Sequence, residues 1–320
     1  MSLVVVGQNW SGLAQECATF FNAPLLTFTQ THFADSESCV DFQHATNLSK
    51  ATVILAFQFM PTDRSETNGS LNDQLAALLQ ITDLLKTMGC KKIILFTPYL
   101  PYSRQDKSED KKLPGSVFML GRCLKSLGIE QIITCELHAP AVIATFPLPL
   151  FSISLEHFWS AVVKQRILDS ILPENLCIVS PDQGGKDRAM RLANLLGVSY
   201  ACTKKIRSSH DVAAGYELEG CVRNMVVLLL DDIVNTGHTA LSASELCLGR
   251  GAQSIFGAFT HALLSGDATT KLGRSRIEKI FITDTICDKS IHADNKIRPI
   301  AIHQFLFQEL AKHLATQKIV

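Results

Sequence analysis

Apolar residues in this chain gather in short blocks that alternate with longer amphipathic stretches. In the first half, continuous apolar runs with the length of buried strands stand at residues 3–6, 52–57, 92–96 and 131–135. Stretches with apolar side chains at helical spacing stand at residues 12–21, 75–88 and 115–127. This order predicts strands and helices that alternate along the first half.

The second half repeats the same order around two polar loops. Residues 176–205 and residues 224–261 each predict a strand, a polar turn, a helix and a second strand. Because the strands are continuously apolar, they predict parallel sheets covered on both faces, which is a doubly wound α/β architecture. We expect two similar domains, residues 1–150 and 151–320, with a final helix at 302–314 that packs on either of them.

Composition excludes several classes of partner. The 320 residues include thirty basic and thirty acidic side chains, so the chain has no strong charge to attract nucleic acid or an anionic membrane. The apolar runs are far shorter than the roughly 20 residues of a membrane span. Ten cysteines lack metal-ligand spacing, and the first residues lack the basic region of a signal peptide. Reduced thiols in the cytoplasm are the simplest interpretation.

The segment VVLLLDDIVNTGHTA carries the strongest chemical signal. Asp231 and Asp232 end a fully apolar strand, and a Thr-Gly-x-Thr turn opens the next helix. Backbone N–H groups and the hydroxyls of Thr236 and Thr239 would cradle a phosphate at the positive end of the helix dipole. The carboxylates suit sugar hydroxyls, or Mg²⁺ through water. An Asp-rich helix cap with a Thr N-cap is the weaker alternative.

The segment LFTPYLPYSRQDK leaves another apolar run through two prolines, which stiffen the backbone ahead of four polar residues. It resembles the ATP-site segment of the ribose-phosphate pyrophosphokinase family. The motifs SPDQGGKDRA, ELHAP and FADSESCV are similar to the same family in the same order, and the DDIVNTGHT run resembles its phosphoribosyl-pyrophosphate signature. Phosphoribosyltransferases share that signature but, at half this length, lack the ATP segment. The chain is identified as a divergent member, with two domains of phosphoribosyltransferase type.

The resemblance implies transfer of the β,γ-diphosphate of ATP to the C1 hydroxyl of ribose 5-phosphate, with Mg²⁺. It places at ATP the residues Phe33, Asp35, Glu37, Arg104, Gln105, Asp106, Lys107 and His138. It places at ribose 5-phosphate the residues Asp182, Asp231, Asp232, Asn235, Thr236, Gly237 and Thr239. It makes His138 and Asp182 metal ligands, and Lys205 and Arg207 the catalytic pair of a basic loop.

Several of these residues also fit a purely structural role. A lone histidine such as His138 is more often structural, and Asp182 fits an ordinary strand-to-helix turn with an Asp cap. Lys205 and Arg207 would otherwise mark a solvated turn, as residues 108–112 after the ATP segment do. Residues 60–70 have the composition of an exposed loop.

The adenine loop of the family reaches in from a neighbouring subunit. The resemblance therefore implies a homo-oligomer, with a dimer as the smallest active unit and a hexamer as the larger alternative. Two other functions stay open: a non-catalytic regulatory paralogue, and a phosphoribosyltransferase that consumes the diphosphate.

Several positions depart from the family pattern. Asn235 stands where an acidic residue is usual, His238 where a small residue is usual, and Asp35 where Asn is usual. Ala45 and Asn47 stand where the ADP-inhibited enzymes carry a Ser and an Arg. We expect altered ribose and base affinity, and weak or absent inhibition by ADP and activation by phosphate.

Overall fold

The computed structural model describes residues 2–42, 47–60, 69–106, 115–206, 215–286 and 296–319. Contacts divide the chain into two compact units. Unit 1 comprises Met1–Ile153 and His303–Val320, and unit 2 comprises Ser154–Ile302. The end of the chain therefore lies with unit 1.

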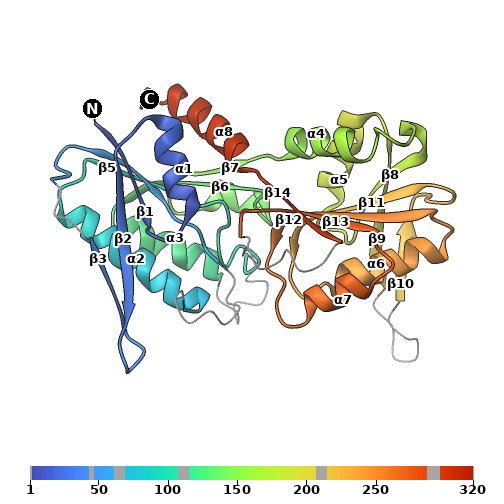
Figure 1. Cartoon of the computed structure of the whole chain (residues 1–320), viewed down its shortest axis with the longest axis horizontal. Helices are drawn as coiled ribbons and strands as arrows, with labels where there is room; N and C mark the ends of the chain where they lie inside the picture. Colours follow the sequence, from blue (N-terminus) through green and yellow to red (C-terminus); the bar gives the residue numbers. More distant parts are fainter. Residues whose placement is uncertain are drawn as a thin grey trace. The chain divides into compact units, whose positions relative to one another are not determined.

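Within the described residues, unit 1 contains a seven-stranded sheet with helices on both faces. Its strands are β1 (Leu3–Gln8), β2 (Leu25–His32), β3 (Ser38–Phe42), β4 (Thr52–Ala56), β5 (Lys92–Phe96), β6 (Ile129–Cys135) and β7 (Leu150–Ile153). Its helices are α1 (Gly12–Phe21), α2 (Leu71–Thr87), α3 (Ser116–Ser126) and α8 (His303–Thr316), with a 3-10 helix at Pro140–Thr145. In Figure 1, α1 and α8 cover one face of the sheet, and α2 and α3 cover the other.

Unit 2 is built in the same way. Its strands are β8 (Leu176–Ser180), β9 (Ser199–Ile206), β10 (Gly215–Glu219), β11 (Val226–Val234), β12 (Ser254–Ala262), β13 (Lys279–Thr283) and β14 (Ile297–Ile300). Its helices are α4 (Glu156–Arg166), α5 (Lys186–Leu196), α6 (His238–Gly249) and α7 (Ala268–Arg274), with a 3-10 helix at Pro173–Asn175. Helices α4 and α5 lie on one face of the sheet, and α6 and α7 lie on the other (Figure 1).

The strand order is the same in both sheets: β3-β2-β1-β4-β5-β6-β7 in unit 1 and β10-β9-β8-β11-β12-β13-β14 in unit 2. Neighbouring strands are parallel, except that β3 pairs antiparallel with β2 and β10 pairs antiparallel with β9. In unit 1 the chain adds strands β1 to β3 in one direction and strands β4 to β7 in the other, starting again beside β1. Unit 2 does the same with β8 to β10 and β11 to β14, so each sheet is doubly wound. This confirms the prediction of two similar α/β units, and in such sheets ligands bind beyond the carboxyl ends of the strands.

Burial explains why these segments form strands and helices. Every residue of β4 is buried, as are the first five of β11, which matches the continuous apolar runs of covered parallel strands. Helix α1 is capped at its start by Ser11, whose hydroxyl accepts from the N–H of Leu13, and at its end by Asn22, which has a left-handed φ of 48°. Helix α2 begins at a capping box formed by Ser70 and Asp73.

Helix α8 joins the sheet of unit 1 through a buried aromatic residue. The ring of Phe307 is fully buried and its centroid lies 6.0 Å from that of Phe96 and 5.7 Å from that of Phe20. His303, the first residue of α8, lies with Nδ1 3.0 Å from Oε2 of Glu16 on α1. None of the helices in the described ranges is long and apolar enough to cross a membrane.

Candidate functional site

Strand β11 extends beyond its neighbour β8 and carries two acidic residues on the extension. Pairing between these strands ends at Leu229 opposite Val179, whereas β11 continues beside β12 as far as Val234. Asp231 and Asp232 therefore lie within β11 instead of at its end, which corrects the sequence prediction. The mismatch in length leaves them at the edge where the loop after β8 enters α5.

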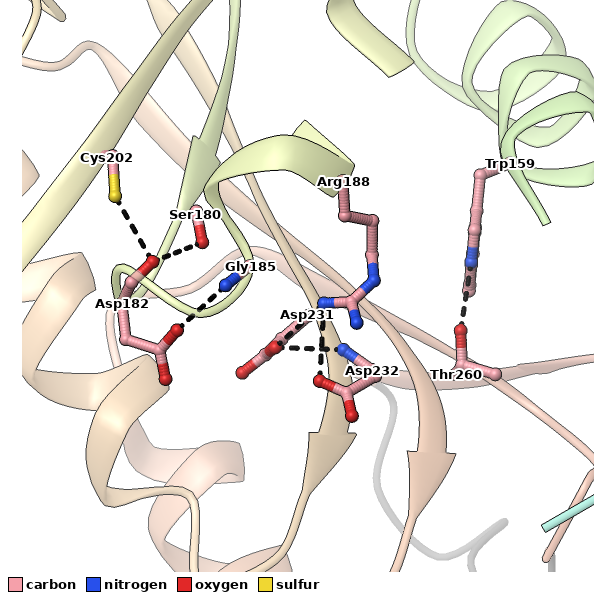
Figure 2. A network of polar contacts seen from close by, with 9 residues as sticks. All are labelled: Trp159, Ser180, Asp182, Gly185, Arg188, Cys202, Asp231, Asp232 and Thr260. Carbon is pink, nitrogen blue, oxygen red and sulfur yellow. Dashed lines mark hydrogen bonds and ion pairs between the residues drawn. The ribbon is translucent and has the colours of Figure 1, made fainter. Parts of the chain in front are cut away.

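Arg188, in the first turn of α5, contacts both acidic residues. Its Nη1 atom lies 3.3 Å from Oδ1 of Asp231 and 3.3 Å from Oδ1 of Asp232 (Figure 2). The backbone N–H of Asp232 also donates to Oδ1 of Asp231 at 2.9 Å. The three side chains are 4–13% exposed. We call these residues the Asp–Asp–Arg cluster.

The cluster places two carboxyl groups beside one guanidinium. Burial and then the neighbouring Asp232 carboxylate raise the pKa of Asp231 well above its usual range, and Arg188 opposes that rise. Such a site favours ligands that donate hydrogen bonds to carboxylate oxygens.

The loop after β8 is fixed by polar contacts around Asp182. Its Oδ1 accepts the N–H of Gly185 at 3.1 Å. This contact is the one expected if Asp182 caps an ordinary strand-to-helix turn. Its carbonyl accepts the hydroxyl of Ser180 at 2.7 Å and the thiol of Cys202 at 3.2 Å. A Cβ at Gly185 would lie 2.6 Å from the Ser180 hydroxyl oxygen, so only glycine fits without a shift. The glycine lets the loop backbone approach the Asp–Asp–Arg cluster.

Helix α6 begins without a side-chain cap. Its N-cap residue is Gly237, in the left-handed region with a φ of 75°, and a glycine has no side chain with which to cap the first turn. The alternative of a threonine N-cap is therefore wrong. Thr236 and Thr239 are exposed, and Oδ1 of Asn235 is buried without a hydrogen-bond partner among the described residues. The backbone N–H groups of the first turn of α6 and the two threonine hydroxyls are available to a phosphate. The amide oxygen of Asn235 is available to a sugar hydroxyl.

The predicted ATP segment leaves the carboxyl end of β5 in unit 1. The carbonyl of Pro98 accepts the N–H of Cys135 at 3.2 Å and the hydroxyl of Thr134 at 3.0 Å, which joins the exits of β5 and β6. Tyr102 has a left-handed φ of 62° and its hydroxyl donates to Oδ1 of Asn72 on α2. Strain of this kind persists only where surrounding contacts hold it.

Most described residues of the predicted ATP segment are buried, and the segment reaches solvent at its polar end. Arg104 and Gln105 are exposed, and Asp106 is half-buried. His138 is half-buried just beyond β6, whereas Lys107 lies outside the described residues. The joined strand exits place Arg104 to Asp106 and His138 at the same edge of the sheet.

The predicted adenine loop is the tight turn between β2 and β3. The N–H of Phe33 donates to the carbonyl of Glu37 at 2.8 Å, and the N–H of Glu37 donates to Oδ1 of Asp35 at 3.1 Å. Both bonds close the turn on itself. The ring of Phe33 is left 54% exposed.

The structure brings some of the predicted residues together and leaves others apart. Asp182, Asp231 and Asp232 surround one loop of unit 2, whereas the predicted ATP residues belong to unit 1. Lys205 is exposed on β9 opposite Tyr216 of β10, and Arg207 lies outside the described residues. No group of three or more His, Cys, Asp or Glu side chains in the described part of the chain is arranged to hold a metal ion.

Sequence reasoning missed Arg188. The residue stands inside the SPDQGGKDRA motif, but a basic residue in the first turn of a surface helix usually points to solvent. The two acids on the neighbouring strand could have pointed to Arg188, because a buried guanidinium needs carboxylate partners.

This fold, with a glycine-bearing loop, a pair of strand acids and an uncapped helix, defines the phosphoribosyltransferase-type class of α/β proteins. A phosphoribosylpyrophosphate synthetase from Mycobacterium smegmatis has the same fold: it covers 99% of this chain and 100% of its own with a TM-score of 0.86, at 24% sequence identity. Residues 2–128 match the model of the N-terminal domain of ribose phosphate pyrophosphokinase, and residues 209–317 match that of the phosphoribosyl synthetase-associated domain.

Curated relatives agree. A ribose-phosphate pyrophosphokinase from Ralstonia nicotianae is 30% identical over 285 residues, which cover 89% of this chain and 85% of the relative. One from Bradyrhizobium diazoefficiens is 28% identical over 319 residues, covering 99% and 96%. The chain therefore belongs to the ribose-phosphate pyrophosphokinase family.

Proposed function

We propose that this protein transfers the β,γ-diphosphate of ATP to the C1 hydroxyl of ribose 5-phosphate, giving 5-phosphoribosyl 1-diphosphate and AMP. The observation that carries the proposal is the Asp–Asp–Arg cluster, followed along the chain by the uncapped N-terminus of α6. Together they offer carboxylates to a sugar and N–H groups to a phosphate.

Ribose 5-phosphate binds at the carboxyl ends of β8 and β11 in this proposal. Asp231 and Asp232 accept hydrogen bonds from the 2- and 3-hydroxyls, because ionised carboxylates are strong acceptors. Thr236, Gly237 and Thr239 hold the 5-phosphate with backbone and hydroxyl donors at the start of α6. The amide oxygen of Asn235, which has no hydrogen-bond partner among the described residues, accepts from a hydroxyl of the sugar. An amide there supplies hydrogen bonds without the charge that the family usually has.

ATP binds to residues of unit 1. The exposed guanidinium of Arg104 and the ammonium of Lys107 meet phosphate oxygens in charge-assisted hydrogen bonds, with Gln105 and Asp106 beside them. The rigid exit from β5 limits the entropy lost on binding. Phe33 stacks on adenine, and Asp35 and Glu37 hydrogen-bond to it.

Mg²⁺ accompanies the nucleotide. It prefers oxygen ligands and commonly takes one or two carboxylates, with phosphate oxygens and water completing the shell. Asp182 supplies such a carboxylate, which fits the finding that no protein cage of three ligands exists among the described residues. The imidazole of His138 suits phosphate oxygens better than this hard cation. Bound Mg²⁺ would supply charge neutralisation of the phosphates.

The chemical step requires positive charge where the transferring group and AMP become more negative. Lys205, near the end of β9, and Arg207, two residues further along the sequence, supply it in this proposal. A homo-oligomer completes the enzyme, since the Phe33 turn projects an exposed ring that can serve the ATP site of a neighbouring subunit.

Ion-exchange chromatography of reaction mixtures tests this function. We expect purified protein to release AMP from ATP and Mg²⁺ only when ribose 5-phosphate is added. A nucleobase added with 5-phosphoribosyl 1-diphosphate should remain unchanged. Conversion of the nucleobase would establish the phosphoribosyltransferase alternative, and binding of both substrates without AMP would establish the regulatory paralogue.

A further inference from the structure

Arg188 is enclosed by the site instead of facing solvent. Its side chain is 8% exposed, although it belongs to the first turn of α5. A Cβ at Gly185 would lie 3.3 Å from Nη1 of Arg188 and 3.6 Å from Oδ1 of Asp231. The loop, the guanidinium and the strand are therefore packed in contact.

One nitrogen of Arg188 draws together two carboxylates that strand geometry separates. Successive side chains of a strand point to opposite faces, so Asp231 and Asp232 would ordinarily diverge. Both Oδ1 atoms nevertheless lie 3.3 Å from Nη1 of Arg188 (Figure 2). Like charges this close repel each other, and the shared cation offsets that repulsion. The arrangement depends on the guanidinium.

We propose that Arg188 is a positioning residue that sets the direction of both ribose-binding carboxylates. The contacts to Nη1 fix the Oδ1 atom of each carboxylate. Holding both Oδ1 atoms on one nitrogen sets the orientation in which the two carboxylates meet the vicinal hydroxyls of the ribose. This inference rests on the proposed function and adds a residue that acts through Asp231 and Asp232 without touching the substrate.

Steady-state kinetics with Arg188→Met and Arg188→Lys test the inference. We expect Arg188→Met to raise the KM for ribose 5-phosphate by roughly tenfold or more, because carboxylate hydrogen bonds to the sugar are misdirected. The KM for ATP should stay within about twofold, because Arg188 belongs to unit 2, whereas the residues proposed for ATP belong to unit 1. Arg188→Lys should recover part of the loss. Arg191→Met is the matched control: it lies on the same helix, is 51% exposed and pairs with Glu156 instead.

A double-mutant cycle with Asp231→Asn separates positioning from direct contact. If Arg188 acts through the carboxylate, adding Arg188→Met to Asp231→Asn should raise the KM by less than about threefold. If the fold-changes in KM of the two single variants multiply in the double variant, the two residues act independently and the inference is contradicted. An equal rise in the KM for ATP would also contradict it and would place Arg188 on the diphosphate. Asp231→Asn also removes one of the two carboxylates that Arg188→Met would leave without a cation, so we expect the double variant to be more stable than Arg188→Met alone.

The failure of this inference differs from the failure of the proposed function. Wild-type protein without turnover contradicts the proposed function, and ribose 5-phosphate affinities measured by calorimetry on the same variants then decide the inference. Wild-type turnover with an unchanged KM in Arg188→Met contradicts the inference alone.

Discussion

Folding places the carboxyl group of Asp231 where its charged form is less stable than in the unfolded chain. Its pKa is raised, first by burial and then by Asp232, so the folded chain binds a proton that the unfolded chain releases. Its contribution to stability is complete below its unfolded pKa and is lost as the pH rises toward the folded value. The residue therefore works against stability at neutral pH, as is usual for binding groups held ready for a ligand.

Asp231→Asn should stabilise the protein and weaken ribose binding. The amide keeps the acceptor for the Asp232 N–H but removes the charge, so we expect the melting temperature to rise more at pH 8 than at pH 4.5. The KM for ribose 5-phosphate should rise roughly tenfold to a hundredfold, as for loss of a hydrogen bond to a charged group. Thermal unfolding at both pH values, with kinetics, measures this. Equal melting temperatures of Asp231→Asn and wild type at pH 8 would show that the Asp231 carboxylate does not destabilise the fold.

At the residue scale, sequence motifs singled out the acids, threonines and glycine of the candidate site but missed Arg188, which contacts both acids. Motifs identify residue types at fixed spacing along one segment. The contacts of Arg188 join two segments, 188 and 231–232, that are brought together only by the pairing of β8 with β11. The length of β11 beyond its neighbour also escaped prediction, because a carboxylate breaks the apolar pattern while the backbone pairing with β12 continues.

At the scale of elements, the loop between β8 and α5 depends on a glycine with an ordinary negative φ. A methyl group at Gly185 would lie 2.6 Å from the Ser180 hydroxyl oxygen, which itself donates to the carbonyl of Asp182. The loop therefore requires the missing side chain for space, and not for a special backbone conformation.

Gly185→Ala should disturb this loop, whereas Gly249→Ala should not. We expect the first change to destabilise the protein by about 1–3 kcal/mol through overpacking and to raise the KM for ribose 5-phosphate. A methyl group at Gly249, the last residue of α6, meets nothing within 4 Å, so that change should stabilise by roughly 0.5–1 kcal/mol. Denaturant unfolding compares the two. A Gly185→Ala protein with wild-type stability and KM would contradict the tight fit.

The attachment of α8 should depend on pH through His313. Its ring stacks on Phe151 with centroids 3.9 Å apart, and its Nε2 lies 2.6 Å from the side-chain amide of Gln131. Burial, followed by the charge of Lys92, lowers the pKa of His313. The unfolded chain then binds more protons, so this contribution to stability is complete above the unfolded pKa of about 6.5 and is lost as the pH falls below it.

We expect His313→Gln to lose less stability between pH 7.5 and pH 5 than the wild type, because the amide does not titrate. His157→Gln, at an exposed position on α4, is the control and should follow the wild type. Thermal unfolding at several pH values measures both. Parallel curves for His313→Gln and wild type would show that His313 carries no pH dependence.

Sequence patterns predicted the central elements better than the edges of the sheets. Helix α1 begins and ends at the predicted residues, 12 and 21, because its caps and its amphipathic face are local properties. The edge strand β3 was not predicted. Its residues alternate between half-buried and exposed, and its place comes from antiparallel pairing with β2. Such pairing has no local signature in a five-residue segment.

At the scale of the whole molecule, two sheets with the same strand order carry the residues proposed for two different ligands. The predicted nucleotide residues gather in unit 1 and the predicted sugar residues in unit 2, although the strand order is identical. In unit 1, the side-chain amide of buried Gln8 bonds to the backbone of Gln58 at the carboxyl end of β1 and beyond that of β4: its Nε2 donates to the carbonyl of Gln58 and its Oε1 accepts the N–H of Gln58, both at 3.0 Å. Neutral glutamines therefore stand in this part of unit 1, whereas unit 2 has carboxylates on β11. The repeat was evident in the sequence, but this division of roles came from the family motifs.

Phe33→Ala should weaken ATP binding without destabilising the fold. The ring is 54% exposed, so its removal should leave the melting temperature nearly unchanged. Loss of stacking on adenine should raise the KM for ATP on the order of tenfold. Leu172→Ala, with a side chain 60% exposed in unit 2, is the control. In an oligomer that shares its sites, wild-type specific activity should also fall on dilution. A wild-type KM for ATP in Phe33→Ala would contradict this role.

The most direct measurement of the central claim is a ³¹P NMR time course of purified protein with ATP, Mg²⁺ and ribose 5-phosphate, beside Lys205→Ala. The account predicts equal growth of AMP and 5-phosphoribosyl 1-diphosphate in the wild type, and loss of both in the variant, because the developing phosphoryl charge loses its cation. Release of ADP or inorganic phosphate in place of these products, or the same rate in Lys205→Ala, would contradict it.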